Sequence, residues 1–222
     1  MKAMILAAGR GERMRPLTDS LPKPLLAAGG KPLIVHHIEK LKRAGISELV
    51  INHAWLGHKL VAALGDGSAF GVSIRWSAEE SALETAGGIV QALPLLGSDP
   101  FLVINGDTWI DADYATLVSQ PLGSDLAHLW LVPNPPQHPD GDFSLQAGRV
   151  QDAPALTFSG IGLYHPAAFA YLPSGARKLA PLLRDWMAQG RVGGSLLAGE
   201  WRDIGTVERL RALDEQLLAG TH

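Results

Sequence analysis

Short apolar runs alternate with amphipathic stretches along the first half of the chain. Residues 4–6 and 49–51 are short and apolar, and residues 72–76 alternate between apolar and polar positions, both of which are typical of strands. Residues 33–41 and 56–64 repeat their apolar positions at helical spacing, and a glycine follows each stretch. The pattern therefore predicts strands and helices in alternation.

Residues 101–104 form a continuous apolar run, which indicates a central parallel strand buried on both faces. Strands that alternate with helices build an open α/β sheet with right-handed crossovers. We therefore predict a single α/β domain over residues 1–222, with a Rossmann-like, mostly parallel sheet flanked by helices. Ligands bind such sheets beyond the carboxyl ends of the strands. Residues 9–15 and 105–107 both follow predicted strands, so we expect them at this edge.

The second half of the chain carries more strand and turn signals. A Pro-rich loop spans residues 134–141, and residues 143–145 and 149–150 flank Ala147-Gly148 as in a hairpin. We expect a small β element here that covers the ligand side of the sheet. The other expected elements are strands at 126–132, at 157–164 (interrupted by Gly160 and Gly162) and at 201–204, and helices at 179–187 and 207–217, the last of which closes the core.

Composition narrows the functional classes. The chain has a net charge of −3 and no cysteine, which excludes disulfides, a thiolate nucleophile and cysteine-based zinc sites. It contains no run of about 18 apolar residues, the length that a membrane span requires. An acidic chain without a basic stripe is unsuited to nucleic acid. We therefore expect a cytoplasmic protein with neither a membrane nor a nucleic-acid partner.

Positive charge is nevertheless concentrated near the N-terminus. The first 23 residues hold five cations against two carboxylates, Glu12 and Asp19, which predicts a small anionic ligand. The cations are Lys2, Arg10, Arg13, Arg15 and Lys23.

A glycine- and arginine-rich loop follows the first predicted strand. Gly9 and Gly11 allow turns that a Cβ would obstruct, so bare N–H groups can converge on phosphate oxygens. Arg13 adds bidentate charge, and Lys23 lies between two prolines. The loop lacks the G-x-x-x-x-G-K-[ST] pattern of a P-loop, and Met14 replaces the third glycine of a dinucleotide fingerprint. We interpret it as a phosphate-binding loop; the alternative is a surface turn with solvated arginines.

Two further segments carry candidate chemistry. Asp107 follows the buried strand beside the phosphate loop, and Mg²⁺ prefers one or two carboxylates together with phosphate oxygens. We predict Asp107 as a metal ligand; the alternative is an aspartate that caps or turns into the next helix. Gly87 and Gly88 open a predicted helix, where a nucleotide base could pack on bare backbone. The alternative is a plain helix start capped by Thr85.

Residues 9–18, with Pro22-Lys23-Pro24, resemble the signature G-x-G-[TE]-R-[ML]-x-P-L-T…P-K-P of the sugar-phosphate nucleotidyltransferases. Enzymes of this family join a nucleoside triphosphate to a sugar 1-phosphate and release pyrophosphate. The resemblance implies the fold of nucleotide-diphospho-sugar transferases, a Mg²⁺ cofactor, and Arg13, Lys23 and Asp107 as catalytic residues. The nucleotide contacts that it implies are Leu6, Ala8, Gly9, Gly11, Glu12, Arg13, Lys23, Thr85, Gly87 and Gly88.

The segment from Trp201 to Thr206 is similar to the family's W-x-D-[VI]-G-T, whose aspartate completes the metal site. This similarity implies Asp203 as the second Mg²⁺ ligand. The alternative is a polar residue beside a helix that Thr206 caps. In a strand, Arg202 would point to the face opposite Asp203, so we do not expect it in the same pocket.

The same resemblance places Asn105 and Asp140 at the sugar, with Gly160 beside them; for Asp140 the alternative is a solvated loop residue. Relatives hold the sugar phosphate with the lysine of an E-K-P segment. Residues 150–154 contain no lysine, and Lys178 is the candidate substitute.

Within the family, residues 51–57, 84–88 and 156–161 resemble the N-acetylmuramate 1-phosphate uridylyltransferases of cell-wall recycling. The chain lacks the C-terminal β-helix and the oligomer-forming tails of other members, so we expect a monomer that acts on small-molecule substrates. Two alternatives stay open. One keeps the chemistry with mannose 1-phosphate and GTP, or glucose 1-phosphate and UTP or dTTP; the other is a non-catalytic nucleotide-sensing domain.

Overall fold

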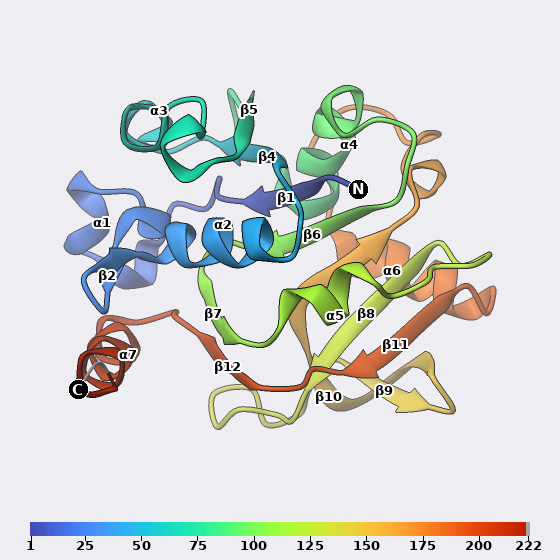
Figure 1. Cartoon of the computed structure of the whole chain (residues 1–222). Coiled ribbons are helices and arrows are strands. Elements are labelled where there is room, and N and C mark those ends of the chain that lie inside the picture. The colour runs from blue at the N-terminus through green and yellow to red at the C-terminus, as the bar shows by residue number, and fades with distance from the viewer. Residues whose placement is uncertain (221–222) are drawn as a thin grey trace.

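A mixed sheet of eight strands forms the centre of the molecule, of which a computed structural model describes residues 1–220 (Figure 1). The strands are β1 (Ala3–Leu6), β4 (Glu48–His53), β5 (Ser73–Ala78), β6 (Phe101–Asn105), β8 (Ala127–Val132), β9 (Phe143–Gln146), β10 (Arg149–Tyr164) and β11 (Val192–Leu196). Their order is β11-β8-β10-β6-β1-β4-β5, and β9 pairs with β10. Strands β6, β1, β4 and β5 are parallel neighbours, as are β8 and β11, whereas β10 is antiparallel to β6 and β8. The predicted mostly parallel α/β sheet is confirmed.

The register of the parallel strands brings three strand ends together. Leu6 at the end of β1 lies opposite Asn52 of β4 on one side and Asn105 of β6 on the other. The loops that follow β1 and β6 therefore leave the sheet at the same edge, as the sequence predicts. The interruption expected in residues 157–164 is a bulge between Phe158 and Ile161, within a continuous β10.

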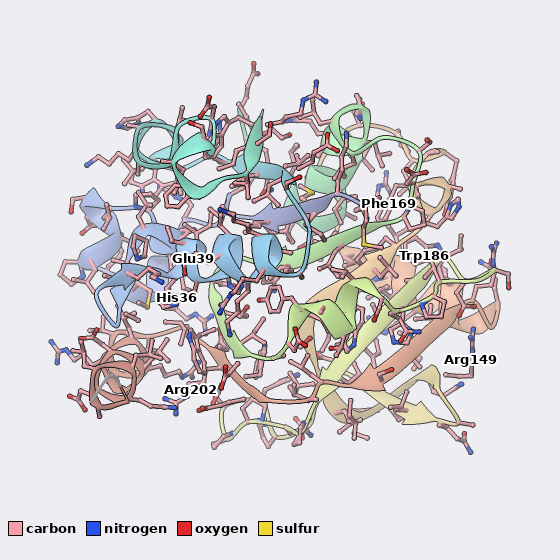
Figure 2. The ribbon with its side chains drawn as sticks, viewed as in Figure 1. His36, Glu39, Arg149, Phe169, Trp186 and Arg202 are labelled. Atoms are coloured by element: carbon pink, nitrogen blue, oxygen red, sulfur yellow. The ribbon has the colours of Figure 1, made fainter. Side chains whose placement is uncertain are left out.

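Helices cover both faces of the sheet. One face packs against α2 (Leu33–Arg43), α3 (Gly57–Leu64) and α5 (Tyr114–Val118), and the other packs against α4 (Glu84–Leu96) and α6 (Leu179–Ala188). Alternate residues of β1 reach the two sides: Ile5 joins the first core and Met4 the second. In Figure 1, α2 and α5 lie in front of the sheet. In the second core, Phe169 meets Trp186 edge-on, with ring centroids 5.4 Å apart (Figure 2).

A third, smaller core lies beside the N-terminal loop. The last helix, α7 (Val207–Ala219), packs Leu210 and Leu213 against Met14 and Trp109, rather than closing the main core as expected. Trp109 comes from β7 (Thr108–Asp111), which pairs with β12 (Glu200–Asp203). The core also includes Ala28 from the hairpin of β2 (Ala27–Ala28) and β3 (Lys31–Pro32). The remaining elements are α1 (Leu17–Ser20) and 3₁₀ turns at Glu12–Met14, Lys23–Leu25, Ser68–Phe70 and Pro166–Ala168. In residues 1–220, no helix is long and apolar enough to span a membrane.

Candidate active site

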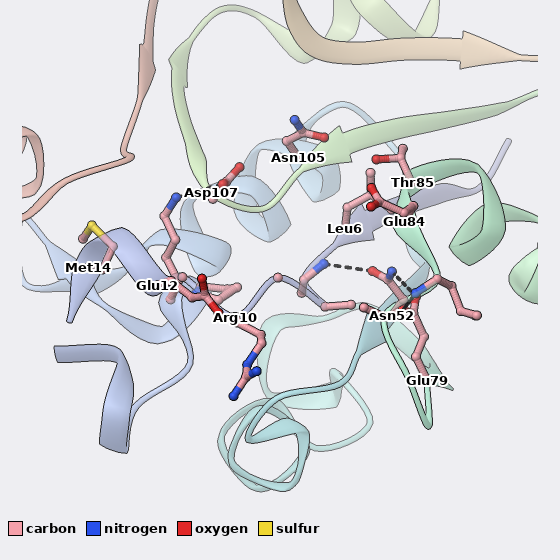
Figure 3. A pocket seen from close by; sticks show the side chains of 18 of the residues that line it. Leu6, Arg10, Glu12, Met14, Asn52, Glu79, Glu84, Thr85, Asn105 and Asp107 are labelled. Carbon is pink, nitrogen blue, oxygen red and sulfur yellow. Dashed lines mark hydrogen bonds and ion pairs between the residues drawn. The ribbon is translucent and has the colours of Figure 1, made fainter. Parts of the chain in front are cut away.

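A pocket of about 590 Å³ opens at the edge where β1, β4 and β6 end (Figure 3). The loop after β1 forms one wall, Asn105 and Asp107 lie on a second, and Glu84 and Thr85 lie at the start of α4. The sequence-predicted residues that line the pocket are Leu6, Ala8, Gly9, Gly11, Glu12, Arg13, Lys23, Thr85, Asn105 and Asp107.

The loop after β1 is shaped by Gly11, whose backbone is left-handed with φ of 65°. A Cβ at this position would lie 2.9 Å from Cγ2 of Thr18, so a side chain is excluded by space as well as by conformation. The Gly11 carbonyl accepts hydrogen bonds from the Met14 amide and the Thr18 hydroxyl, both at 2.8 Å. Met14 is fully buried and anchors the turn, while Glu12 and Arg13 remain exposed. The loop thus presents charge to the pocket from a fixed backbone.

Lys23 packs directly against this loop, since a Cβ on Gly11 would lie 3.2 Å from the Lys23 Cβ. It is 6% exposed, in a 3₁₀ turn that Pro22 precedes, and its Nζ donates to the Asp107 carboxylate at 2.8 Å. The Asp107 side chain is 42% exposed, so the buried cation is paired with a carboxylate that also reaches solvent. The alternative role for Asp107, capping the next helix, falls instead to Asp113, which accepts from the Ala115 amide at the start of α5.

Asp203 lies close to Asp107 through the ribbon of β7 and β12. Asp203 is the register partner of Thr108, and the Ile204 amide donates to the Asp107 carbonyl at 3.1 Å. The Asp203 carboxylate accepts from Arg209 Nη1 at 2.5 Å. Thr206 caps α7 as expected, without Asp203. Arg202 pairs with Glu200 on the surface, on the far face of the strand (Figure 2).

The donors Asp107 and Asp203 fit a magnesium ion by their chemistry. In residues 1–220, no group of three or more histidines, cysteines, aspartates or glutamates gathers as a closed metal cage. Two carboxylates leave coordination positions for water and substrate phosphate, which is the arrangement that Mg²⁺ prefers. Each carboxylate also pairs with a cationic side chain, Asp107 with Lys23 and Asp203 with Arg209.

The paired glycines at the start of α4 are buried against protein atoms instead of facing the pocket. A Cβ on Gly87 would lie 2.4 Å from the Gly175 carbonyl oxygen, and one on Gly88 would lie 2.7 Å from a Glu79 carboxylate oxygen. The alternative for this segment, a helix start capped by Thr85, is wrong. The Ala86 and Gly87 amides donate to the Arg177 carbonyl at 3.0 and 3.2 Å, and no side chain caps the helix. Thr85 alone of these residues reaches the pocket.

The residues predicted for the sugar are only partly brought together. Gly160 has φ of 80°, and a Cβ there would lie 2.4 Å from the Asn105 amide nitrogen, so this glycine makes room for Asn105 at the pocket wall. Asp140 is exposed in the Pro-rich loop, and Lys178 is exposed at the start of α6. Neither Asp140 nor Lys178 lines the pocket in this structure.

Two buried polar residues of the pocket were missed from sequence. Asn52, 3% exposed, accepts from the Ala7 amide at 2.8 Å and donates to Glu79 at 2.7 Å (Figure 3). Glu79, 7% exposed, also accepts from the Leu83 amide at 3.2 Å. These bonds join the loop after β1 to the start of α4. The sequence did contain a signal for Asn52, because an asparagine at the end of a buried apolar strand is unusual. Glu79 lies in a polar stretch, where nothing in the sequence distinguishes it.

The fold and the pocket describe an α/β protein with a cationic loop and two carboxylates at the strand ends. A family model described as nucleotidyl transferase matches residues 2–138, so the chain belongs to the nucleotidyl transferase family. Within it, the N-acetylmuramate alpha-1-phosphate uridylyltransferase of Neisseria meningitidis serogroup B is 56% identical over 230 residues, which cover 99% of each chain.

More distant relatives agree with this assignment. The protein of the same name from Caulobacter vibrioides is 34% identical, over 97% of this chain and 96% of its own. Among solved structures, one from Bacillus anthracis, named after glucose-1-phosphate thymidylyltransferase, superposes with a TM-score of 0.87 at 26% identity and covers 98% of this chain and 95% of its own. The family expected from the sequence motifs is confirmed.

Proposed function

We propose that this protein is a uridylyltransferase that joins UTP to N-acetylmuramate α-1-phosphate and releases pyrophosphate. The observation that carries the proposal is the 56% identity to the Neisseria relative across 99% of both chains. The Caulobacter relative, at 34% identity over almost the full length, supports the same substrates. The cationic loop and the two carboxylates supply groups that such a reaction needs.

In this reaction a phosphate oxygen of the sugar 1-phosphate attacks the α-phosphorus of UTP. The new phosphorus–oxygen bond forms as the bond to the β-phosphate breaks, and pyrophosphate leaves with the electron pair. Because the attacking oxygen is already anionic at neutral pH, no general base is required. The barrier lies in bringing anions together and in neutralising the leaving charge, so positioning and electrostatic stabilisation carry the rate.

The roles of the residues follow from their places around the pocket. Arg13 and the amides of Gly11 and Glu12 would hold the β- and γ-phosphates, and Lys23 would bind the α-phosphate after leaving Asp107. Mg²⁺ held by Asp107 and Asp203 would supply further neutralising charge at the α-phosphate. The start of α4, at Thr85, would face the nucleoside, and Asn105 would face the sugar.

Pyrophosphate release tests the proposal directly. UTP, GTP, dTTP and CTP are each paired with N-acetylmuramate, N-acetylglucosamine, mannose and glucose 1-phosphates in the presence of Mg²⁺. We expect the highest kcat/KM for UTP with N-acetylmuramate 1-phosphate. A preference for another pair would retain the reaction and discard these substrates. No release with any pair, from folded protein that still binds a nucleotide, would overturn the enzymatic assignment in favour of nucleotide sensing.

A further inference from the structure

Arg10 lines the pocket but has no acidic partner. Its guanidinium carbon lies 4.9 Å from the centre of the Trp55 ring, and no ion pair joins Arg10 to a carboxylate within residues 1–220. Arg13 likewise has no ion pair within residues 1–220, whereas Arg15 pairs with Asp19 at 2.6 Å and Lys23 pairs with Asp107. Arg10 therefore keeps its charge uncompensated at the pocket, with an aromatic ring as its support.

Trp55 holds the phosphate-binding loop at two points. It follows β4, and its ring face supports Arg10 near the start of the loop. Its indole N–H donates to the Thr18 carbonyl at 3.0 Å, at the end of the loop. Thr18 is 2% exposed, and its hydroxyl donates to the Gly11 carbonyl at 2.8 Å. A continuous set of contacts thus joins Trp55 to the glycine that shapes the loop.

A guanidinium stacked on a ring keeps its in-plane N–H groups available. Stacking on an aromatic face is a preferred environment of arginine, and the free N–H edges match phosphate oxygens bidentately. Since Asp107 pairs with Lys23 and Asp203 with Arg209, neither of these carboxylates neutralises Arg10, which is available for a ligand anion. In Figure 3, Arg10 extends away from Asn105 and Asp107.

We infer that Arg10 binds the terminal phosphates of the nucleoside triphosphate, which leave as pyrophosphate, and that Trp55 is the positioning residue that aims it. This inference rests on the proposed function in that it names a further contact of the same pocket. It adds Arg10, which is not one of the fixed residues of the motif, as a triphosphate-binding residue. It also adds Trp55, from another loop, as a residue that acts through Arg10.

Inorganic tripolyphosphate isolates this contact because it carries neither base nor sugar. Its dissociation constant is measured by calorimetry for the wild type, Arg10→Ala and Arg15→Ala. Arg15 is the matched control: it is a loop arginine that is exposed, paired with Asp19 and absent from the pocket lining. We expect Arg10→Ala to weaken binding about tenfold, the effect of one lost charge-assisted hydrogen bond, and Arg15→Ala to change it less than about twofold.

The role of Trp55 is tested with two replacements. Trp55→Phe keeps a ring face for Arg10 and loses the N–H donor to Thr18, whereas Trp55→Leu loses both. We expect the leucine variant to bind tripolyphosphate about threefold more weakly than the phenylalanine variant, the weakening that loss of an exposed cation–π contact gives. In the Arg10→Ala background this difference between the two variants should vanish. KM for UTP should rise together with the dissociation constant of tripolyphosphate, while KM for the sugar phosphate stays unchanged.

Two outcomes would overturn the inference: tripolyphosphate binding by Arg10→Ala equal to that of the wild type, or a difference between the Phe and Leu variants that persists without Arg10. Thermal unfolding of each variant identifies a folding defect, and the phenylalanine variant keeps the test available if the leucine variant is unstable. If the base or the sugar in the proposed function is wrong, the expected results for tripolyphosphate binding stay the same. Conversely, failure of the Arg10 contact leaves the proposed reaction standing.

Discussion

Lys23 and Asp107 form an ion pair across the pocket, with Nζ 2.8 Å from Oδ2. The pair joins two segments that are 84 residues apart in the chain, the 3₁₀ turn after Pro22 and the strand end of β6. Only one partner is buried: the Lys23 side chain is 7% exposed and that of Asp107 is 42% exposed. The residues proposed for phosphate and metal binding therefore neutralise each other in this structure.

The unequal burial of this pair predicts unequal effects of removing each partner. Asp107→Ala leaves a buried ammonium without its counterion and should lower the free energy of unfolding by about 2 kcal/mol, less than for a fully buried pair. Lys23→Met keeps the apolar stem and leaves a carboxylate in water, so its loss should stay below about 1 kcal/mol. Both should reduce turnover by a factor of about 10²–10³. Urea denaturation and pyrophosphate release measure the two effects, with Asp107→Asn as the control that keeps an acceptor. Near-wild-type turnover in either variant would contradict the roles proposed here.

Gly205 is a position where a substitution should lower turnover with little change in stability. A Cβ there would lie 2.9 Å from Asp203 Oδ2, 3.0 Å from Arg209 Nη1 and 3.2 Å from Arg13 Nη2, the ends of three flexible side chains. Gly205→Ala should therefore displace these side chains and lower turnover about tenfold or more, while the free energy of unfolding changes by less than about 1 kcal/mol. Gly106→Ala is the contrast, because its Cβ would lie 2.7 Å from the Leu6 carbonyl oxygen. A backbone atom moves less easily than the end of a side chain, so this variant should lose more stability than Gly205→Ala. Equal stability losses in the two variants would refute this distinction.

Local signals made most of this fold predictable. The strands at 49–51 and 101–104 and the helix at 33–41 were found because apolar periodicity is a property of neighbouring residues. The shape of the loop proposed to bind phosphate was predictable for the same reason, because the glycine at position 11 and the prolines around Lys23 are local features of the sequence. The shared sheet edge followed from the parallel topology, which strand–helix alternation determines.

What the sequence did not reveal depends on packing between distant segments. Gly87 and Gly88 look suited to a ligand, yet what excludes a side chain at Gly87 is Gly175, from a loop far along the chain. The bond between Asn52 and Glu79 spans 27 residues, and no local pattern marks it. Lys178 was named only as a substitute for the lysine of the E-K-P segment, and its position in the sequence does not determine whether its side chain reaches the pocket.

Asn52 offers a prediction about the connection between the phosphate-binding loop and α4. Asn52→Leu would leave the Ala7 amide and the Glu79 carboxylate buried without their partner. We expect a loss of about 3 kcal/mol in the free energy of unfolding, since each unsatisfied group costs about 1–3 kcal/mol. KM for the nucleotide should rise as well, because both ends of the connection line the pocket. Glu79→Gln, which keeps an acceptor for the Asn52 amide, should lose less than half as much. A leucine variant as stable as the wild type would show that the connection is dispensable.

His37 lies beneath the same site and makes it sensitive to acid. It is 1% exposed on α2, and its Nε2 lies 2.8 Å from the Thr108 carbonyl, which can only accept. Nε2 therefore carries the proton, and Nδ1 accepts from the Tyr114 hydroxyl at 2.7 Å. Burial lowers the pKa of His37 from 6.5 to about 4. Thr108 directly follows Asp107 and pairs with Asp203, so this histidine supports the segment that bears the proposed metal ligands.

The lowered pKa of His37 gives a defined pH window for stability. Between about pH 6.5 and 4 the unfolded chain binds a proton at this position and the folded chain does not, so acid favours unfolding. The contribution is complete above pH 6.5 and should fall by about 3 kcal/mol by pH 4. Urea denaturation at pH 7.5, 5.5 and 4.2 should show the free energies of unfolding of the wild type and His37→Gln converging as the pH drops. The control is His58→Gln, the same exchange at an exposed position, measured at the same three pH values. If His37→Gln keeps the wild-type slope, the histidine is not held neutral in the folded protein.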